Sequence, residues 1–438
     1  MSFELNTRHS GDDRATGPDG DFSTDHADTL DALLAAYQPG DSLFASPSGA
    51  WLGQGVACTL RAGDGTAWPA SVEGRAQAAA DVGRRARALL AQAEQTPGLH
   101  DPIVMGVVPF DVRQPARLVV PRQVRRAVGG QRIEATAPGS AWAPVVLARP
   151  AQPAPEPAAY EAAVTNALAR FARGDLDKVV LARTLRLTLQ AAPDRAALLR
   201  RLVAGNTHGY TYAIALTDAA GAAAEGLAEP AAFVGATPEL LVRRTGRQVV
   251  VNPLAGSAAR SADPVRDPQI GQALMQSPKD RHEHAVVIDS VARALRPLCR
   301  TLTVPEAPSL VATDALWHLS TTLTGELADP ATSSLDLALA LHPTPAVCGH
   351  PSAPAFDAIA ALEPFERGFF AGFVGWCDAR GDGEWAVALR CAELRDRELR
   401  LYAGAGIVAG SVPASESLET GTKFRTMLSA LGLGSALD

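Results

Sequence analysis

Two segments with helical spacing carry clustered charged side chains of the kind that can bind a divalent cation. The clusters are Glu416, Glu419 and Lys423 in 414–432, and Asp280, Glu283 and His284 in 277–298. Residues that are three, four or seven positions apart share one face of a helix. Because Mg²⁺ binds few carboxylates together with water and substrate oxygens, two such faces could form a magnesium site. For either helix alone, an exposed face with ion pairs is the better explanation.

A lysine and a glutamate lie where acid–base chemistry is possible. Lys178 begins the apolar segment KVVLAR, and burial beside a strand favours the neutral form of a lysine, which can act as a general base. Glu239 lies in GATPELL, a turn that enters a strand, where a carboxyl held in its protonated form could act as an acid. Taken singly, each residue is explained better as an exposed charge.

Three further features point to the binding of a small anion. The segment 403–410 has the spacing GxGxxxG, which differs from the dinucleotide-binding GxGxxG and favours backbone N–H contacts with a small anion. Arg390 in AVALRCAEL could hold a carboxylate with two parallel hydrogen bonds, although an ordinary strand arginine fits the same pattern. His318 in LWHLSTTL is, by itself, better explained as a core histidine than as a catalytic one.

The elements that must position these residues alternate between helices and groups of strands. Helical spacing occurs at 28–38, 76–95, 160–175, 194–205, 277–298 and 414–432. Strand-like segments fall between them in hairpin-like groups that are separated by Gly, Pro and Asp turns. This order predicts an α+β fold rather than a doubly wound parallel sheet.

Composition and charge exclude several classes of function. The 438 residues carry a formal net charge of −7, which argues against binding to nucleic acid or to an anionic membrane. Gly, Pro or charged residues interrupt every apolar stretch, so no membrane span is predicted. Five cysteines without CxxC spacing favour a reducing cytoplasm over a disulfide framework or a zinc site. We expect a monomer, with a disordered polar leader over 1–27.

Ten segments occur in an order that is typical of one enzyme family. They include DKVVLARTL, GATPELLV, NPLAGSAAR, SPKDRHEHAVVID, VALRCAEL, YAGAGIVAGS and SESLETGTKF. Together they resemble chorismate-utilising enzymes over about residues 160–430. The segment GVVPFDVRQPARLVVP extends the resemblance into the first half of the chain, and it is similar to siderophore-type isochorismate synthases.

The resemblance implies a fold and a cofactor. We expect an α+β fold of two stacked antiparallel β-sheets, with helices on the outside and the active site between the sheets. A single catalytic domain would cover 28–438, with a β-rich half at about 28–150 and a half that carries the active site at about 158–435. Mg²⁺ is the implied cofactor and chorismate the implied substrate.

The resemblance also implies a role for each chemical residue. Lys178 matches the general base that activates water for attack at C2 of chorismate, and Glu239 matches the general acid that protonates the departing C4 hydroxyl. The matching metal site consists of Glu283 and Glu419 as direct ligands, with Asp280 and Glu416 as surrounding acids. The matching substrate-binding residues are Gly256, Ser257, His318, Ala346, Val347, Phe370, Arg390, Gly404, Ala405, Gly406 and Lys423.

Within the family, a few positions distinguish the reactions. Ser352 stands where ammonia-using relatives have a lysine, which disfavours their chemistry. Ala346-Val347 is similar to the Ala-Leu of isochorismate synthases rather than the Thr-Ala of salicylate synthases, and Phe370 replaces the tyrosine of the latter. We therefore expect an isochorismate synthase for siderophore or menaquinone biosynthesis. A salicylate synthase that also eliminates pyruvate and a non-catalytic chorismate-binding homologue are the alternatives.

Overall fold

The computed structural model describes residues 28–60, 67–129 and 145–434, and the leader predicted over 1–27 lies outside these ranges. The helices are α1 (Leu30–Ala36), α2 (Val72–Glu94), α3 (Pro157–Ala172), α4 (Arg195–Ala204), α5 (Ala219–Ala224), α6 (Arg266–Gln276), α7 (Pro278–Leu295), α8 (Ser334–Leu341), α9 (Ser352–Leu362) and α10 (Pro413–Leu431). In this part of the chain no helix is both long enough and apolar enough to cross a membrane.

The strands of the first half are β1 (Ser42–Ser46), β2 (Gly49–Thr59), β3 (Ile103–Val108), β4 (Arg117–Val128) and β5 (Gln152–Ala154). The strands that follow are β6 (Lys178–Thr188), β7 (Tyr210–Ala215), β8 (Ala232–Thr237), β9 (Leu240–Thr245), β10 (Gln248–Asn252), β11 (Leu254–Ala259), β12 (Cys299–Thr303), β13 (Ser309–Ala312), β14 (Leu316–Ser320), β15 (Leu323–Leu327), β16 (Gly349–His350), β17 (Phe373–Asp378), β18 (Gly383–Val387), β19 (Cys391–Arg395) and β20 (Glu398–Val408).

The helices that carry the charged clusters begin and end where local chemistry allows. α7 starts after Ser277, whose hydroxyl accepts a hydrogen bond from the Asp280 N–H, and Pro278 occupies its first position. α10 also has a proline at its first position and ends at Gly432, which has φ of 76° in the left-handed region. Both helices therefore match the predicted spans 277–298 and 414–432 closely.

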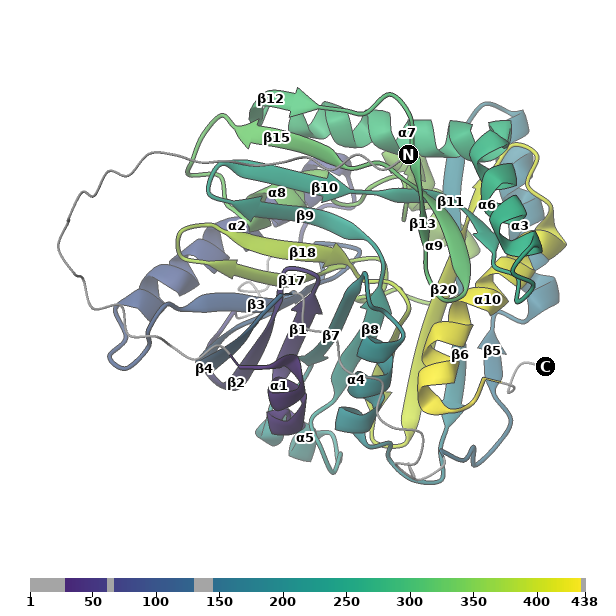
Figure 1. Ribbon diagram of the computed structural model, residues 1–438. Coiled ribbons are helices and arrows are strands. Elements are labelled where there is room, and N and C mark those ends of the chain that lie inside the picture. The colour runs from purple at the N-terminus through teal and green to yellow at the C-terminus, as the bar shows by residue number, and fades with distance from the viewer. Residues whose placement is uncertain (1–27, 61–66, 130–144, 435–438) are drawn as a thin grey trace, which may run out of the picture.

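Seventeen strands form one hydrogen-bonded antiparallel sheet within the described residues. From one end to the other the order is β12-β15-β10-β9-β18-β17-β3-β4-β2-β1-β7-β8-β19-β20-β6-β5, and β16 also pairs with β6. Figure 1 shows the strand direction turning along this order, from β12, β15 and β10, which run across the view, to the steep β8, β20 and β6. The predicted α+β class and its antiparallel sheets are confirmed.

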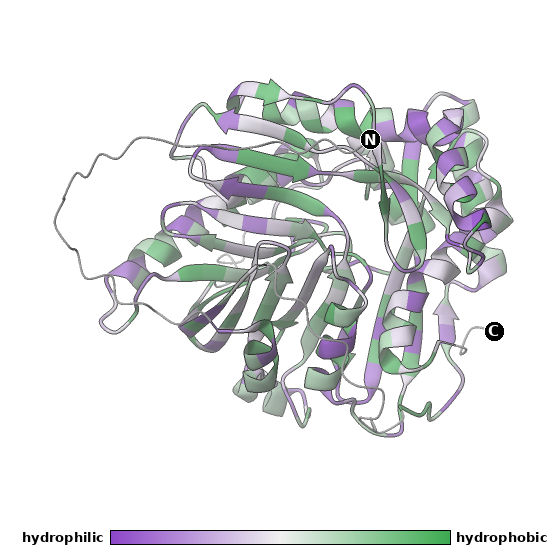
Figure 2. Cartoon of the chain, viewed as in Figure 1, coloured by the Kyte–Doolittle hydropathy of each residue, from purple (hydrophilic) through white to green (hydrophobic). Residues whose placement is uncertain are grey.

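Hydrophobic side chains fill two core clusters on different parts of this sheet. The first includes Leu335 of α8 and Phe356 of α9, packed with strand residues such as Phe373. The second includes Leu199 of α4 and Leu428 of α10. Figure 2 shows hydrophobic residues along the middle of the sheet strands and hydrophilic residues gathered on α6 at the outer edge. Helices thus cover the apolar sheet surfaces, as expected for this class.

Specific polar contacts fix the two charged helices in place. Arg183 of β6 donates from Nε to the Thr420 hydroxyl at 2.7 Å and thereby holds α10 against the sheet. His284 of α7 has its two ring nitrogens 3.1 Å from Ala255 O and 2.8 Å from the Thr321 hydroxyl. Burial lowers the pKa of His284, so the ring is neutral and serves to hold α7 against β11. β11 belongs to a separate three-stranded sheet with β14 and β13.

Candidate active site

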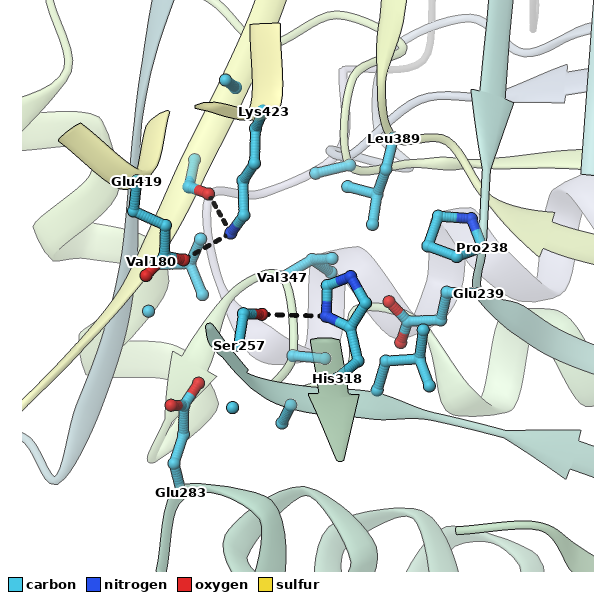
Figure 3. Close-up of a pocket in the computed structure, with 18 of the residues that line it drawn as sticks. Val180, Pro238, Glu239, Ser257, Glu283, His318, Val347, Leu389, Glu419 and Lys423 are labelled. Atoms are coloured by element: carbon cyan, nitrogen blue, oxygen red, sulfur yellow. Dashed lines mark hydrogen bonds and ion pairs between the residues drawn. The ribbon is translucent and has the colours of Figure 1, made fainter. Parts of the chain in front are cut away.

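A cavity of about 280 Å³ lies where β20, β6 and α10 face β11, β14 and the N-terminal end of α7. Most of the predicted site residues line it, namely Glu239, Gly256, Ser257, Asp280, Glu283, His318, Ala346, Val347, Phe370, Arg390, Gly404, Gly406, Glu416, Glu419 and Lys423. Figure 3 shows Glu239 on one side of His318, with Glu283, Glu419 and Lys423 on the other. The tertiary structure therefore brings both predicted helices and several strands to one place.

Lys178 lies behind the cavity wall, in contact with Glu283. Its Nζ is 2.8 Å from Glu283 Oε1, and its side chain is only 1% exposed. Burial raises the pKa of Glu283, but the charges of Lys178, Lys423 and Lys279 outweigh that effect and hold this pKa below its usual value. The Lys178–Glu283 pair is thus a buried ion pair next to the cavity.

Gly406 makes this ion pair possible. A Cβ atom at this position would lie 2.5 Å from Glu283 Oε1 and 3.3 Å from Lys178 Cε. β20 pairs with β6 so that Gly406 lies opposite Val180, two positions after Lys178. Only a residue without a side chain leaves room there for the carboxylate.

Glu239 is the buried carboxyl of the site, and it is 3% exposed between β8 and β9. Burial raises its pKa to about 7, although a backbone hydrogen bond at Leu254 and the charges of Lys178 and Arg390 act in the opposite direction. A carboxyl with this pKa is about half protonated at neutral pH and largely protonated below it, so it can donate a proton.

His318 forms a polar pair with Ser257 at the middle of the cavity. Its Nδ1 lies 2.9 Å from the Ser257 hydroxyl (Figure 3), while its buried Nε2 has no hydrogen-bond partner within the described residues. Burial, together with the charges of Arg390 and Lys423, holds the pKa of His318 well below its usual value. The ring is therefore neutral, and its free nitrogen is available to a ligand.

Lysines accompany the glutamates of α10. Lys423 donates from Nζ to Glu419 Oε1 at 2.7 Å and to Gly404 O at 2.8 Å. Lys279 of α7 lies 3.3 Å from Glu416 Oε1 and also lines the cavity. Lys279 was not predicted as a site residue, although its position next to Asp280 could have indicated it.

The four acids of α7 and α10, here called the carboxylate cluster, all line this cavity. Burial and the neighbouring carboxylates Glu283 and Glu419 raise the pKa of Asp280. Burial and the charge of Glu419 likewise raise the pKa of Glu416. Clustered carboxylate oxygens suit Mg²⁺, which would relieve this mutual repulsion. As the described side chains stand, no group of three or more His, Cys, Asp or Glu residues is arranged to coordinate a metal ion.

Two backbone positions with positive φ shape the wall of the cavity. Arg390 has φ of 49° and is 9% exposed, and burial lowers its pKa from the ordinary arginine value. Gly256 has φ of 81°, and a Cβ there would lie 3.1 Å from Asp280 Cβ. These conformations place a guanidinium group on one part of the wall and the N-terminal turn of α7 close to β11 on another.

Apolar residues form the remaining wall. Val347 and Phe370 are buried, and the Phe370 ring stacks on Tyr402 with centroids 5.3 Å apart. Tyr402 and Leu389 line the cavity but were not predicted, because an apolar residue in a strand carries no chemical signal in the sequence. This wall suits the ring of a small hydrophobic acid.

Two predicted residues do not line the cavity. Lys178 is covered by Glu283, as described above, and Ala405 is fully buried in the hydrophobic core between the two cavity-lining glycines. Since side chains alternate along a strand, Ala405 faces away from the site that Gly404 and Gly406 line. Its contribution to a site could come only from its backbone.

Proteins of known identity are similar to this chain over most of its length. The isochorismate synthase DhbC of Bacillus subtilis is 49% identical over 401 residues, which cover 92% of this chain and 96% of that protein. The isochorismate synthase EntC of Escherichia coli is 42% identical over 336 residues, or 77% of this chain and 83% of that protein.

Solved structures agree with the sequence comparison. The crystal structure of a putative 2,3-dihydroxybenzoate-specific isochorismate synthase, DhbC from Bacillus anthracis, has a TM-score of 0.80 and 44% identity, covering 92% of this chain and 99% of that chain. The menaquinone-specific isochorismate synthase MenF of Escherichia coli has a TM-score of 0.72 and 25% identity, covering 93% and 92%. The family model described as chorismate binding enzyme matches residues 132–432. The chain therefore belongs to the family of chorismate-binding enzymes.

Proposed function

We propose that this protein is an isochorismate synthase that converts chorismate into isochorismate. The observation that carries the proposal is Glu239, a buried carboxyl in the cavity wall whose pKa of about 7 leaves about half of it protonated at neutral pH. Hydroxide is a poor leaving group, so a proton donor is needed where the C4 hydroxyl departs. The names of the relatives described above support the same reaction.

In the proposed reaction, a base and an acid act on the two ends of an allylic displacement. Lys178 takes a proton from water while the water oxygen bonds to C2 of chorismate. Both ring double bonds shift, C1=C2 to C1=C6 and C5=C6 to C4=C5, the C4–O bond breaks, and Glu239 gives its proton to the departing hydroxyl. One water enters and one leaves, so the product is an isomer of the substrate. Proton exchange with solvent then resets both groups for the next turnover.

The two carboxylates of chorismate need separate binding groups. We place the enolpyruvyl carboxylate at Arg390 and the backbone N–H groups of 404–406, which offer charge and hydrogen bonds. We place the ring carboxylate near Lys423 and the Gly256–Ser257 turn. Glu283 and Glu419 would hold Mg²⁺, with Asp280 and Glu416 around it. The ion would polarise the ring carboxylate and share the negative charge of Glu283, which pairs with Lys178 in this structure.

The apolar wall supports release of isochorismate without loss of pyruvate. Ala346 and Phe370 line the cavity without a side-chain hydroxyl, whereas salicylate synthases have Thr and Tyr at these two positions. We propose a role in siderophore biosynthesis, which the 2,3-dihydroxybenzoate specificity named for the Bacillus anthracis relative supports.

The test is incubation of the purified chain with chorismate and Mg²⁺, followed by chromatography of the products and an enzymatic assay of pyruvate. We expect isochorismate without a stoichiometric amount of pyruvate, and no turnover in EDTA. Salicylate together with an equal amount of pyruvate would make the chain a salicylate synthase. Unchanged chorismate would contradict the proposal.

A further inference from the structure

A buried ion pair outside the cavity supports the segment that carries Val347. The side chains of Arg367 and Glu363 are 3% and 2% exposed, and Arg367 Nη2 lies 2.5 Å from Glu363 Oε1. Glu363 also accepts a hydrogen bond of 2.8 Å from the Ala182 N–H of β6. Neither charged residue lines the cavity, so neither is placed to contact the substrate.

The guanidinium group of Arg367 joins two backbone segments that do line the cavity. Its Nη1 donates to Val347 O and its Nη2 to Val180 O, each at 2.8 Å. The Val180 N–H donates in turn to Cys348 O at 2.9 Å. Because the guanidinium is planar and its donors are fixed, it sets the spacing between the Val347 turn and β6, which begins with Lys178.

The same arginine also supports Phe370. Its guanidinium carbon lies 5.7 Å from the centroid of the Phe370 ring, and the Phe370 N–H donates to Arg367 O at 3.0 Å. The Phe370 ring also stacks on the ring of Tyr402, with their centroids 5.3 Å apart. The two apolar residues of the cavity wall, Val347 and Phe370, therefore share one buried support.

We infer that the Glu363–Arg367 pair is a positioning element that stops the reaction at isochorismate, an inference that rests on the proposed function. Loss of pyruvate from isochorismate breaks the C3–O bond to the enolpyruvyl group. The hydrogen on C2 moves to the methylene carbon of that group, while the ring C2=C3 bond and the pyruvate C=O bond form. The products are salicylate and pyruvate, so atoms and electrons balance without a further reactant.

This transfer needs the enolpyruvyl group to fold over the ring until its methylene carbon reaches the hydrogen on C2. Val347 and Phe370, held by Arg367, occupy the apolar wall and keep the group extended. A well-packed wall resists such a rearrangement because its side chains have no alternative low-energy positions. Loosening the support gives the enolpyruvyl group room to fold.

The substitution Arg367→Lys tests this role. A lysine keeps a positive charge beside Glu363, but its single ammonium group has no planar set of donors to hold both Val347 O and Val180 O. With chorismate and Mg²⁺, we expect the ratio of pyruvate to isochorismate to rise about tenfold over the unsubstituted protein. The matched control is Arg244→Lys. Arg244 is also buried and donates to two carbonyls, Gly246 O at 2.8 Å and Pro330 O at 3.0 Å, but it does not line the cavity.

Each outcome decides the inference. A folded Arg367→Lys variant with an unchanged product ratio, or one that loses both products in proportion, overturns it. If that variant does not fold, Glu363→Gln replaces it, because glutamine keeps an acceptor for Ala182 and removes only the charge. A raised ratio in that variant supports the inference and an unchanged ratio overturns it. If neither variant folds, the pair serves the fold itself and the inference is wrong. Absence of isochorismate from the unsubstituted protein would instead refute the proposed function.

Discussion

Glu239 shows how one buried position gives a carboxyl its chemistry. In the sequence it is a glutamate in a turn, and an exposed glutamate there would be ionised at neutral pH. In the structure it is 3% exposed, and burial raises its pKa to about 7. Ionisation of a buried carboxyl destabilises the folded state, so Glu239 at this position lowers the stability of the protein at high pH.

The substitution Glu239→Gln is expected to lower kcat by roughly 100- to 10,000-fold, because it removes the proposed proton donor and keeps its size. KM for chorismate should change little. Steady-state assays of isochorismate formation check this expectation. Glu326→Gln is the control, since Glu326 is 45% exposed on β15 and does not line the cavity. Comparable kcat values for the two variants would show that Glu239 is not the acid.

The pKa of Glu239 also predicts how activity and stability change with pH. An acid must be protonated, so kcat/KM should fall as pH rises through about 7. The folded-state pKa lies above the ordinary glutamate value of 4.5, so stability is retained below pH 4.5 and lost as pH rises through about 7. Relative to the unsubstituted protein, Glu239→Gln should be more stable at pH 8.5 by up to about 3 kcal/mol, with little difference at pH 4.5. Denaturant unfolding at both pH values measures this, and a pH-independent difference would contradict it.

At the scale of elements, the site depends on how closely β20 approaches α7. β20 carries Gly406 directly against the Lys178–Glu283 pair, while α10 packs against the same strand. Strand pairing sets this approach, since Gly406 lies opposite Val180 of β6. The strand–helix contact therefore leaves no space for a side chain.

Gly406→Ala is expected to lower kcat at least about tenfold, because its Cβ would lie 2.5 Å from Glu283 Oε1 and force this carboxylate to move. Steady-state kinetics with chorismate at several Mg²⁺ concentrations measure this effect. The matched control is Gly421→Ala in α10, where the nearest atom to an added Cβ is Arg183 Nη2 at 3.8 Å. The control should keep its activity and gain about 0.5–1 kcal/mol in stability, because alanine is the better helix former. Full activity in Gly406→Ala would show that the close approach does not matter.

At the scale of the whole molecule, the site is assembled from segments that are far apart in the sequence. The carboxylate cluster comes from α7 and α10, and these helices are separated by more than a hundred residues. The main sheet includes strands from both halves of the chain, and we propose that residues 28–438 fold as one domain. A ligand that bridges α7 and α10 would therefore bind only the folded protein.

Mg²⁺ is accordingly expected to raise the melting temperature of the protein. A ligand that binds only the folded state at 100 times its Kd stabilises that state by about 2.7 kcal/mol. Calorimetry in EDTA and in millimolar Mg²⁺ measures the shift, and EDTA should also abolish turnover. Glu419→Gln should reduce both effects, whereas Glu398→Gln, on the exposed end of β20, should preserve them. An equal melting temperature with and without Mg²⁺, together with activity in EDTA, would rule out a metal at this cluster.

Local residue patterns predicted six of the ten helices in the described part of the chain, missed α5, α6, α8 and α9, and gave no strand pairing. The segments 277–298 and 414–432 are α7 and α10 almost to the residue, because caps and apolar spacing act within one helix. α2 begins at Val72 rather than near 76, because the Ser71 hydroxyl accepts a hydrogen bond from the Gly74 N–H and begins the helix earlier. The order of the strands depends on contacts between distant residues, which no local pattern records.

The sequence by itself determined the family, the α+β class and most of the candidate site residues. Ordered motifs identify a family, and spacing within a helix determines which of its side chains share a face. Only the tertiary structure decided what those residues contact. Folding buried Lys178 behind Glu283, turned Ala405 into the core, brought Lys279 and Tyr402 to the cavity, and set the Glu363–Arg367 pair behind its wall. Burial sets the ionisation of these groups, and the distances between remote segments set their contacts. Both arise only when the chain has folded.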